Sequence, residues 1–428
     1  MKKICDKIKN AKPSTIFIAL GLIFLLVSLL YICLNNGNPM KTLMWNAETG
    51  GIFPDFYESL KDARYLTPYE SLAIYPPLVY VLLFPISKLI ISSPFYWNQT
   101  PHTYNFVSLS TTQSAIIVGV IFFLLVTLAT LLLFQDKSKF NKKKLFLFSM
   151  IFLCSPGFIY LLDRGNILLI AVILLFVFLN NYESKNKAKR EISILGLVAA
   201  SCFKIYPAIF GLLLLVKKRF KDIAKCFVYG IILFIIPFIF VGGYKAIPKF
   251  IDNITTLNDN HKEGDRNFGY GYKIDLNNFI EIGQAKIHND TLSTIFKFVV
   301  VIGVATSLLF VTIFAKEDWM KIASLSMIMI LIPGFSYIYT AVYMILPISF
   351  FFVERKKLDR NTLIYIILFV LIFAPLPYGY VLKNAPGKNK LSYSTLVVEL
   401  SLLALTAKML YDVAINKFKY FKKKAIKN

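Results

Sequence analysis

The feature that most constrains this chain is a series of apolar segments long enough to cross a lipid bilayer. Of its 428 residues, 57% are hydrophobic and 17% are charged, whereas a soluble domain carries about 25% charged residues. A helix spans the hydrocarbon core with about 20 apolar residues. The sequence therefore predicts an all-α polytopic membrane protein with about twelve transmembrane helices, at residues 14–34, 113–134, 145–162, 167–181, 192–203, 205–216, 226–241, 295–314, 322–335, 338–353, 362–381 and 393–412.

The first of these runs, residues 14–34, follows a basic stretch and has the layout of a signal peptide. It is long for the apolar part of such a peptide, and no small-x-small cleavage pattern precedes Asn35. We therefore interpret it as the first transmembrane helix.

The basic residues, which give a formal net charge of +24, gather in blocks between the apolar runs, at residues 2–12, 137–144, 185–190, 217–225, 355–360 and 417–427. Such blocks mark cytoplasmic loops. The charge thus predicts a lipid bilayer as partner and no nucleic acid, with both termini cytoplasmic. Only seven of the 48 basic residues are Arg, and this Lys-rich bias suggests a bacterial plasma-membrane protein.

The chain is expected to form one transmembrane domain over residues 1–412, followed by a basic cytoplasmic tail at 413–428. Two polar stretches, 35–112 and 242–294, are expected on the outer side. Within the first, the apolar segment 73–92 contains three prolines, which interrupt helix hydrogen bonding. We expect it to be juxtamembrane or re-entrant. The stretch 242–294 is either a lid over an acceptor or a passive loop.

Two pairs of apolar segments are too short to span the membrane singly. Residues 192–216 form a predicted hairpin with its apex at Lys204-Ile205-Tyr206-Pro207, and residues 322–353 repeat the pattern around Pro333 to Tyr337. Broken helices at membrane depth occur where they are buried in protein or line a watery cavity. The two apices therefore indicate an outward-facing cavity.

The first outer stretch holds acidic residues among many aromatic ones. Asp55, Glu58 and Asp62 follow i, i+3, i+7 spacing, so one helix face could carry all three. Solvent exposure of that face is the simpler interpretation, and a catalytic carboxylate is the functional one.

Arg164, Lys204 and Asp163 lie beside apolar runs, where charge is expensive, at about 2.5–3.5 kcal/mol per residue. One interpretation is an Asp163–Arg164 ion pair with Lys204 reaching out to the membrane surface. The other is a cationic pocket for a phosphate group.

Motifs of other site classes are missing from the sequence. It has no HExxH, no Gly-x-x-x-x-Gly-Lys loop and no Asp-x-Asp pair, and its five cysteines show no paired spacing. Three histidines, at 102, 261 and 288, are scattered over polar loops. We therefore predict no metal site, no cofactor and no disulfide framework.

A set of short motifs occurs in a distinctive order, namely Asp55-Phe56, Pro68-Tyr69, Tyr75-Pro76-Pro77-Leu78, Arg164-Gly165-Asn166, Lys204-Ile205-Tyr206-Pro207 and Ile332-Pro333. In this order the chain resembles the membrane glycosyltransferases of the GT-C superfamily. It is most similar to family 87, the polyprenyl-phosphate-mannose-dependent mannosyltransferases, over roughly residues 14–350.

The resemblance implies an outer-face enzyme that moves a sugar, mannose or another hexose, from a polyprenyl phosphate to an envelope glycan or glycolipid. It implies that Asp55 is the catalytic base, and we expect inversion at the anomeric carbon because one base acts opposite the leaving phosphate. The expected substrate-binding residues are Arg64, Tyr75, Arg164, Asn166, Lys204 and Tyr337.

One departure from the family concerns the second predicted hairpin, residues 322–353, which we call the late hairpin. Members often carry a Trp and a His there, whereas this chain reads Ile332 to Tyr339 without a histidine, which leaves the sugar and the acceptor class open. Two other functions remain: a lipid or glycan transporter or flippase, and a non-catalytic envelope-assembly scaffold. Transport also uses broken helices and intramembrane charge.

Overall fold

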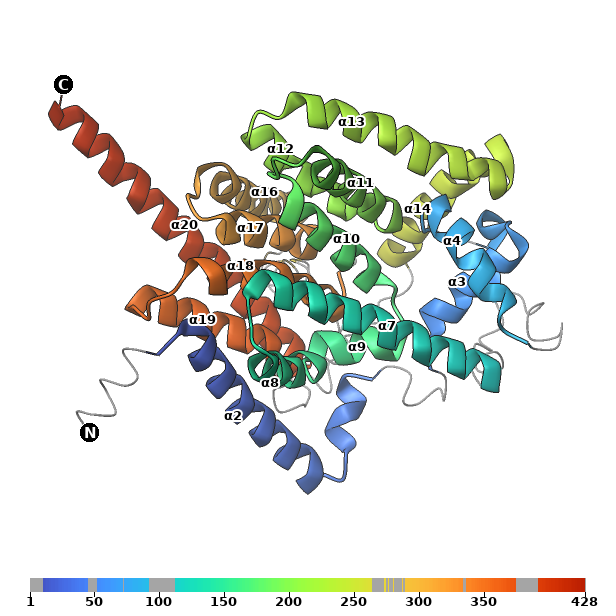
Figure 1. Cartoon of the computed structure of the whole chain (residues 1–428), viewed down its shortest axis with the longest axis horizontal. Helices are drawn as coiled ribbons and strands as arrows, with labels where there is room; N and C mark the ends of the chain where they lie inside the picture. Colours follow the sequence, from blue (N-terminus) through green and yellow to red (C-terminus); the bar gives the residue numbers. More distant parts are fainter. Residues whose placement is uncertain are drawn as a thin grey trace.

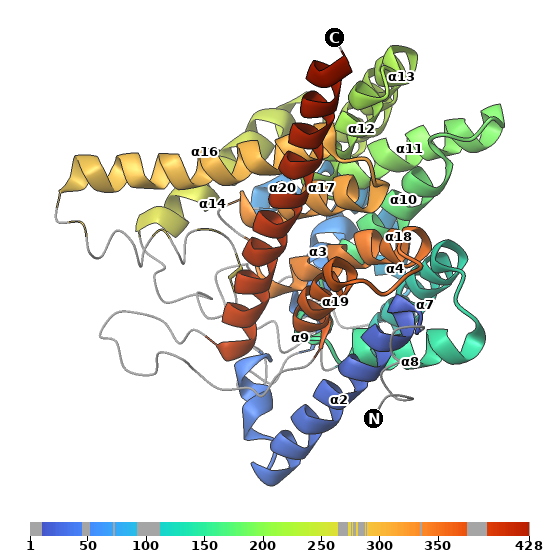
Figure 2. The same cartoon turned by 90° about the vertical axis from the view of Figure 1, so that its left-hand side faces the viewer.

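The computed structural model describes residues 11–44, 52–71, 73–91, 112–263, 273, 274, 276, 280, 287, 289–333, 336–374 and 392–427. The expectations for the histidines at 102 and 288 lie outside these residues. Within the described residues the chain is mainly helical, and the C-terminal end of α20 projects away from the packed body (Figures 1 and 2).

The α-helices are α2 Pro13–Leu34, α3 Pro54–Tyr65, α4 Pro77–Lys88, α7 Gln113–Ser138, α8 Lys142–Leu153, α9 Pro156–Arg164, α10 Leu168–Asn181, α11 Lys187–Phe203, α12 Leu212–Val216, α13 Phe220–Gly230, α14 Ala246–Glu263, α16 Asp290–Phe314, α17 Asp318–Leu331, α18 Ile345–Glu354, α19 Arg360–Phe373 and α20 Tyr393–Lys427. Shorter turns are η1 Asn38–Thr42, η3 Pro68–Ser71, η4 Tyr206–Gly211, η5 Ile231–Ile235, η6 Ile236–Phe240, η7 Gly243–Lys245 and η9 Ile338–Met344.

Four helical segments of the described chain are long and apolar enough to cross a bilayer: Pro13–Leu34, Gln113–Ser138, Phe220–Phe240 and Thr291–Phe314. Their exposed surfaces are rich in Leu, Ile, Val and Phe, which suits contact with lipid. Several other apolar helices have only 10–17 residues. The structure therefore agrees with a polytopic membrane protein, and it does not establish the predicted number of twelve spans.

The expected span at 145–162 is broken in the structure. α8 ends at Leu153 and α9 begins at Pro156, and their axes meet at 65°. Ser155 caps α9 by accepting a hydrogen bond from the Phe158 N–H, and proline is favoured in the first helical turn. The pair is a bent span or a re-entrant loop, and the local signal for the break is Ser155-Pro156.

Both predicted hairpins contain irregular helix, as expected. In the first, α11 ends at Phe203 and the 3₁₀ turn η4 begins at Tyr206, two residues after Lys204. In the second, α17 ends at Leu331 and chain 336–344 returns through the 3₁₀ turn η9.

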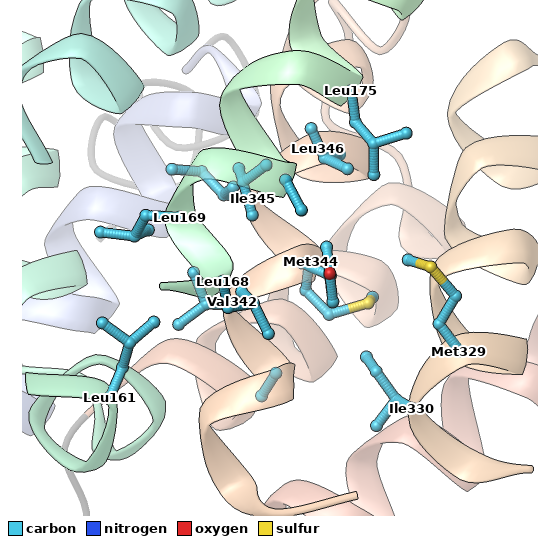
Figure 3. Packing of buried hydrophobic residues seen from close by; sticks show 14 of the residues in the cluster. Leu161, Leu168, Leu169, Leu175, Met329, Ile330, Val342, Met344, Ile345 and Leu346 are labelled. Atoms are coloured by element: carbon cyan, nitrogen blue, oxygen red, sulfur yellow. The ribbon is translucent and has the colours of Figure 1, made fainter. Parts of the chain in front are cut away.

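Apolar side chains from α9, α10, α17, η9 and α18 form the core between these hairpins (Figure 3). Leu161, Leu168, Ile330, Val342 and Ile345 are each at most 2% exposed. Because α10 begins two residues after Asn166 and packs against α11, α7 and α18, this core fixes the loop that precedes it.

The segment 73–92 and the C-terminal tail both contain helix. The segment 73–92 contains the 12-residue helix α4, about 18 Å long, which is too short to cross a core of about 30 Å. Residues 413–427 of the predicted tail are helical, because α20 continues through them without a break.

The described part of the second polar stretch, 242–294, contacts several other parts of the protein. In α14, buried Asn253 donates hydrogen bonds to the Tyr69 and Ala73 carbonyls of the first outer stretch. Further on, Lys273 and Tyr337 form an antiparallel bridge, and the Ile274 N–H donates to the Ser336 carbonyl at 2.8 Å. The stretch 242–294 therefore contacts both the first polar stretch, 35–112, and the hairpin formed by residues 322–353.

Candidate active site

The first turn of α3 carries the central carboxylate. Pro54 occupies the first helical position and Asp55 follows it, so the negative charge lies near the positive end of the helix dipole. Phe53 precedes them with a left-handed φ of 50°, and its ring packs on Phe123 with centroids 4.7 Å apart. Aromatic packing thus holds the start of α3 in place.

The end of α9 approaches this point because position 165 is a glycine. Gly165 has φ +66°, and the Gly165 and Asn166 N–H groups bond back to Leu162 and Leu161 in a Schellman cap. A Cβ at Gly165 would lie 2.5 Å from the Phe53 Cα. A residue without a Cβ is therefore required for α9 to meet α3.

This approach brings Arg164 and Asn166 onto the two oxygens of Asp55. The Arg164 Nη2 lies 2.5 Å from Asp55 Oδ1, and the Asn166 Nδ2 donates to Asp55 Oδ2 at 3.1 Å. The Asn166 Oδ1 accepts the Leu168 N–H, which orients the amide with its nitrogen toward the carboxylate. Both oxygens of Asp55 are therefore bound by donors.

Tyr75 links this cluster to the apex of the first hairpin. The Lys204 Nζ donates to the Tyr75 hydroxyl at 3.1 Å and lies 4.3 Å from the centre of its ring, while Asn166 Nδ2 lies 3.4 Å from the same hydroxyl. Burial raises the pKa of Tyr75 above its usual value, so the phenol stays protonated at neutral pH. Asp55, Arg164, Asn166, Tyr75 and Lys204 form one connected network.

Tyr337 lies beside the network in a group of tyrosine rings. It stacks on Tyr339 and on Tyr160, with centroids 5.9 and 6.3 Å apart. Tyr160 stands one turn before Arg164 in α9. The late hairpin therefore forms an aromatic wall next to the cation that binds Asp55.

Arg64 lies apart from the network. Its Nη1 donates to the Ser87 carbonyl at 2.6 Å, and Lys88 Nζ lies 3.4 Å from the Arg64 carbonyl. Nine residues of α3, about 14 Å, separate it from Asp55. The structure thus places Arg64 at the contact between α3 and α4.

Glu58 lies next to the Asp55 network, although the sequence analysis identified it only as one of three acids on a helix face. It stands one turn after Asp55 in α3. Burial, with the nearby Asp55 charge, raises the pKa of Glu58 to about 7, while Arg164 and Lys61 act in the other direction. The signal in the sequence was the i, i+3 spacing, which does not distinguish an exposed face from a buried one.

Lys273 is a second residue that the sequence reasoning missed. It is 6% exposed, and its backbone pairs with Tyr337. The surrounding sequence is polar loop, so nothing local marks this lysine among the 41 in the chain.

Within the described residues, no group of three or more His, Cys, Asp and Glu side chains has the arrangement of a metal site. The charged groups of the network are one carboxylate, Asp55, and two cations, Arg164 and Lys204. This arrangement can accept a proton from a hydroxyl and bind a phosphate in neighbouring positions.

The sequence of this chain is similar to one known protein family. No curated protein matches the chain significantly. The family model described as Glycosyltransferase family 87 matches residues 73–336, which include Tyr75, Arg164, Asn166 and Lys204 and leave Asp55 outside. This match covers more than half of the chain, which therefore belongs to glycosyltransferase family 87, a family of GT-C membrane glycosyltransferases.

Proposed function

We propose that this protein transfers a hexose, mannose or a close relative, from a polyprenyl-phosphate carrier to an envelope glycan or glycolipid on the outer face of a bacterial plasma membrane. Family membership supports the glycosyltransferase class. The observation that carries the finer proposal is the network in which Asp55 and Lys204 are joined through Asn166 and Tyr75, with Arg164 on the same carboxylate.

In the proposed transfer, Asp55 handles the proton of the acceptor, and the cations Arg164 and Lys204 handle the charge of the leaving phosphate. The acceptor hydroxyl loses its proton as its oxygen attacks the anomeric carbon, and Asp55 is the carboxylate that takes it. The bond from that carbon to the phosphate oxygen breaks, and the electron pair leaves on the polyprenyl phosphate. The base and the leaving group act on opposite faces of the carbon, so the product has inverted configuration.

The leaving phosphate gains charge, and cations stabilise it. Arg164 supplies a planar guanidinium that stays charged at neutral pH and lies beside Asp55. Lys204 adds a compact charge beside the Tyr75 hydroxyl. The donor needs no nucleotide and no cofactor in this scheme, and neither residue requires a metal to bind phosphate.

The direct test is transfer in proteoliposomes with radiolabelled polyprenyl-phosphate mannose and a panel of wall polymers, lipoglycans and capsule precursors. Wild-type protein is expected to label one acceptor, whereas Asp55→Asn is expected to lose at least about 100-fold in kcat and keep its affinity for the donor. Asp55→Asn with wild-type turnover would refute the role of Asp55.

The same preparation separates the enzyme from the other candidates. A flippase would move the labelled donor between leaflets without forming a labelled acceptor, and a scaffold would do neither. Labelling that requires Asp55 excludes both as the main activity.

A further inference from the structure

The two neighbouring carboxyls of α3 have opposite hydrogen-bond environments. Arg164 donates to one oxygen of Asp55 and Asn166 to the other. Both oxygens of Asp55 therefore already accept a hydrogen bond, and Asp55 must release the proton that it takes before the next turnover. A second group close to Asp55 is needed to receive that proton.

Glu58 has the complementary environment. Within the described residues no hydrogen bond or ion pair to its carboxyl is formed, and its side chain is partly exposed. The charged and titratable groups around it are Asp55 and Lys61 of α3 and Arg164 of α9, with the Tyr75 phenol before α4. A half-buried carboxyl without donors favours its neutral form, and burial raises its pKa to about 7.

The spacing of the two residues suits proton transfer. Asp55 and Glu58 are i and i+3 on α3, so their Cβ atoms are about 5–6 Å apart, a separation that one bridging water can cover. The general base of an enzyme works best when its pKa lies close to the working pH, and Glu58 meets this condition.

We propose that Glu58 is the proton acceptor that restores Asp55 during transfer. The inference rests on the proposed function and adds a residue to its mechanism. The acceptor O–H breaks as the oxygen bonds to the anomeric carbon, and its proton passes to Asp55. It then passes to a Glu58 oxygen and leaves to water at the outer surface, while the phosphate departs with the electron pair of the broken bond.

The test compares the pH dependence of kcat for wild-type and Glu58→Gln protein in proteoliposomes. Wild-type kcat is expected to fall below about pH 7, because protonated Glu58 can no longer accept the proton. Glu58→Gln is expected to lose this limb and to be about 10–100-fold slower at pH 8, with the donor KM within about twofold of wild type. Glu58→Asp should restore part of the rate and move the limb to lower pH.

Glu70→Gln is the matched control, because Glu70 is an exposed carboxylate of the same outer stretch that pairs with Lys249. It is expected to keep the wild-type rate and pH profile. Thermal unfolding of each variant at pH 8 establishes that a slow variant is folded.

The possible outcomes separate the relay from the proposed function. If Asp55→Asn is inactive and Glu58→Gln keeps the wild-type rate and profile, the relay is wrong and the transferase assignment stands. If wild-type protein transfers no sugar from polyprenyl-phosphate mannose, glucose or galactose, the proposed function fails and the relay falls with it. Independently, a carboxyl infrared band that titrates near pH 7 should vanish in Glu58→Gln, and its persistence in that variant contradicts the assignment to Glu58.

Discussion

Gly165 and Phe53 approach each other more closely than a side chain at position 165 would permit. A Cβ there would lie 2.5 Å from both the Cα and the Cβ of Phe53. Phe53 begins α3 immediately before Pro54 and Asp55, and Gly165 follows Arg164 at the end of α9. This single backbone contact therefore sets the distance between the carboxylate and its guanidinium partner.

Replacing Gly165 with alanine is expected to move α9 away from α3. The left-handed φ costs about 1–2 kcal/mol for a residue with a Cβ, and the contact with the Phe53 backbone adds to this cost. We expect a lower unfolding temperature and at least a tenfold loss of transfer activity.

Gly303→Ala in α16 is the control for that substitution. Its φ is not left-handed, and a Cβ added at Gly303 would meet no neighbouring element within 4 Å. In a helix interior such a change stabilises by up to about 1 kcal/mol. An equally harmful effect of both alanines would show that the close approach at Gly165 is unimportant.

Lys204→Ala is expected to weaken donor binding more than it slows the chemical step. The ammonium group lies on Tyr75 at the hairpin apex, where it supplies charge for a phosphate. The KM for polyprenyl-phosphate sugar should rise by about tenfold or more, which corresponds to about 1.4 kcal/mol of binding. Lys204→Arg should recover part of the affinity, and an unchanged KM in Lys204→Ala would remove Lys204 from the phosphate site.

Tyr75→Phe tests the hydroxyl that joins Lys204 to Asn166. The ring remains, so the contact of the lysine with the aromatic face is kept, and the two hydroxyl contacts at 3.1 and 3.4 Å are lost. One such hydrogen bond contributes about 1 kcal/mol, so we expect a five- to tenfold loss in kcat/KM. Wild-type kcat/KM in this variant would contradict a connected network.

Asn253→Ala should loosen α14 from the first outer stretch. The amide donates to the carbonyls of Tyr69 and Ala73, and its removal leaves both without this donor. Trypsin is expected to cleave near α14 several-fold faster in this variant. Thr255→Ala is the control, because its exposed hydroxyl donates to the Ile251 carbonyl within α14, and equal cleavage of the two variants would show that Asn253 does not hold the helix.

The stability of the protein should also report the state of Glu58. Its pKa is about 4.3 in an unfolded chain and about 7 in the folded protein, so between these values the folded state binds more protons. Stability therefore falls as pH rises through that interval. Glu58→Gln removes this contribution, so its unfolding temperature should exceed that of wild type more at pH 8 than at pH 4.5.

Some features of the site were expected from the resemblance to family 87 and from the cost of charge at membrane depth. Asp55, Arg164, Asn166, Tyr75 and Lys204 were expected to share a substrate site, and the structure joins them by direct contacts. Their catalytic and binding roles remain predictions. Arg64 lies near the other end of α3, where its Nη1 donates to the Ser87 carbonyl, because the start of α3 is the end that packs against α9.

The pattern of apolar runs also has a limit. It located the helices, but it did not report the break between α8 and α9 or the continuation of α20 to Lys427. Hydropathy measures how apolar a segment is, and a bent helix has the same composition as a straight one. The bend at Ser155-Pro156 depends on a cap and a proline, which are short-range signals inside a long apolar run.

The sequence by itself determined that this chain is a helical membrane protein with broken hairpins, because apolar length and proline positions act locally along the backbone. Only the tertiary structure decided that Arg164 binds Asp55 across 109 positions, that Glu58 lies half-buried one turn away from that pair, and that Lys273 reaches Tyr337. These facts depend on which helices pack together, and that packing is set by contacts between residues far apart in the chain.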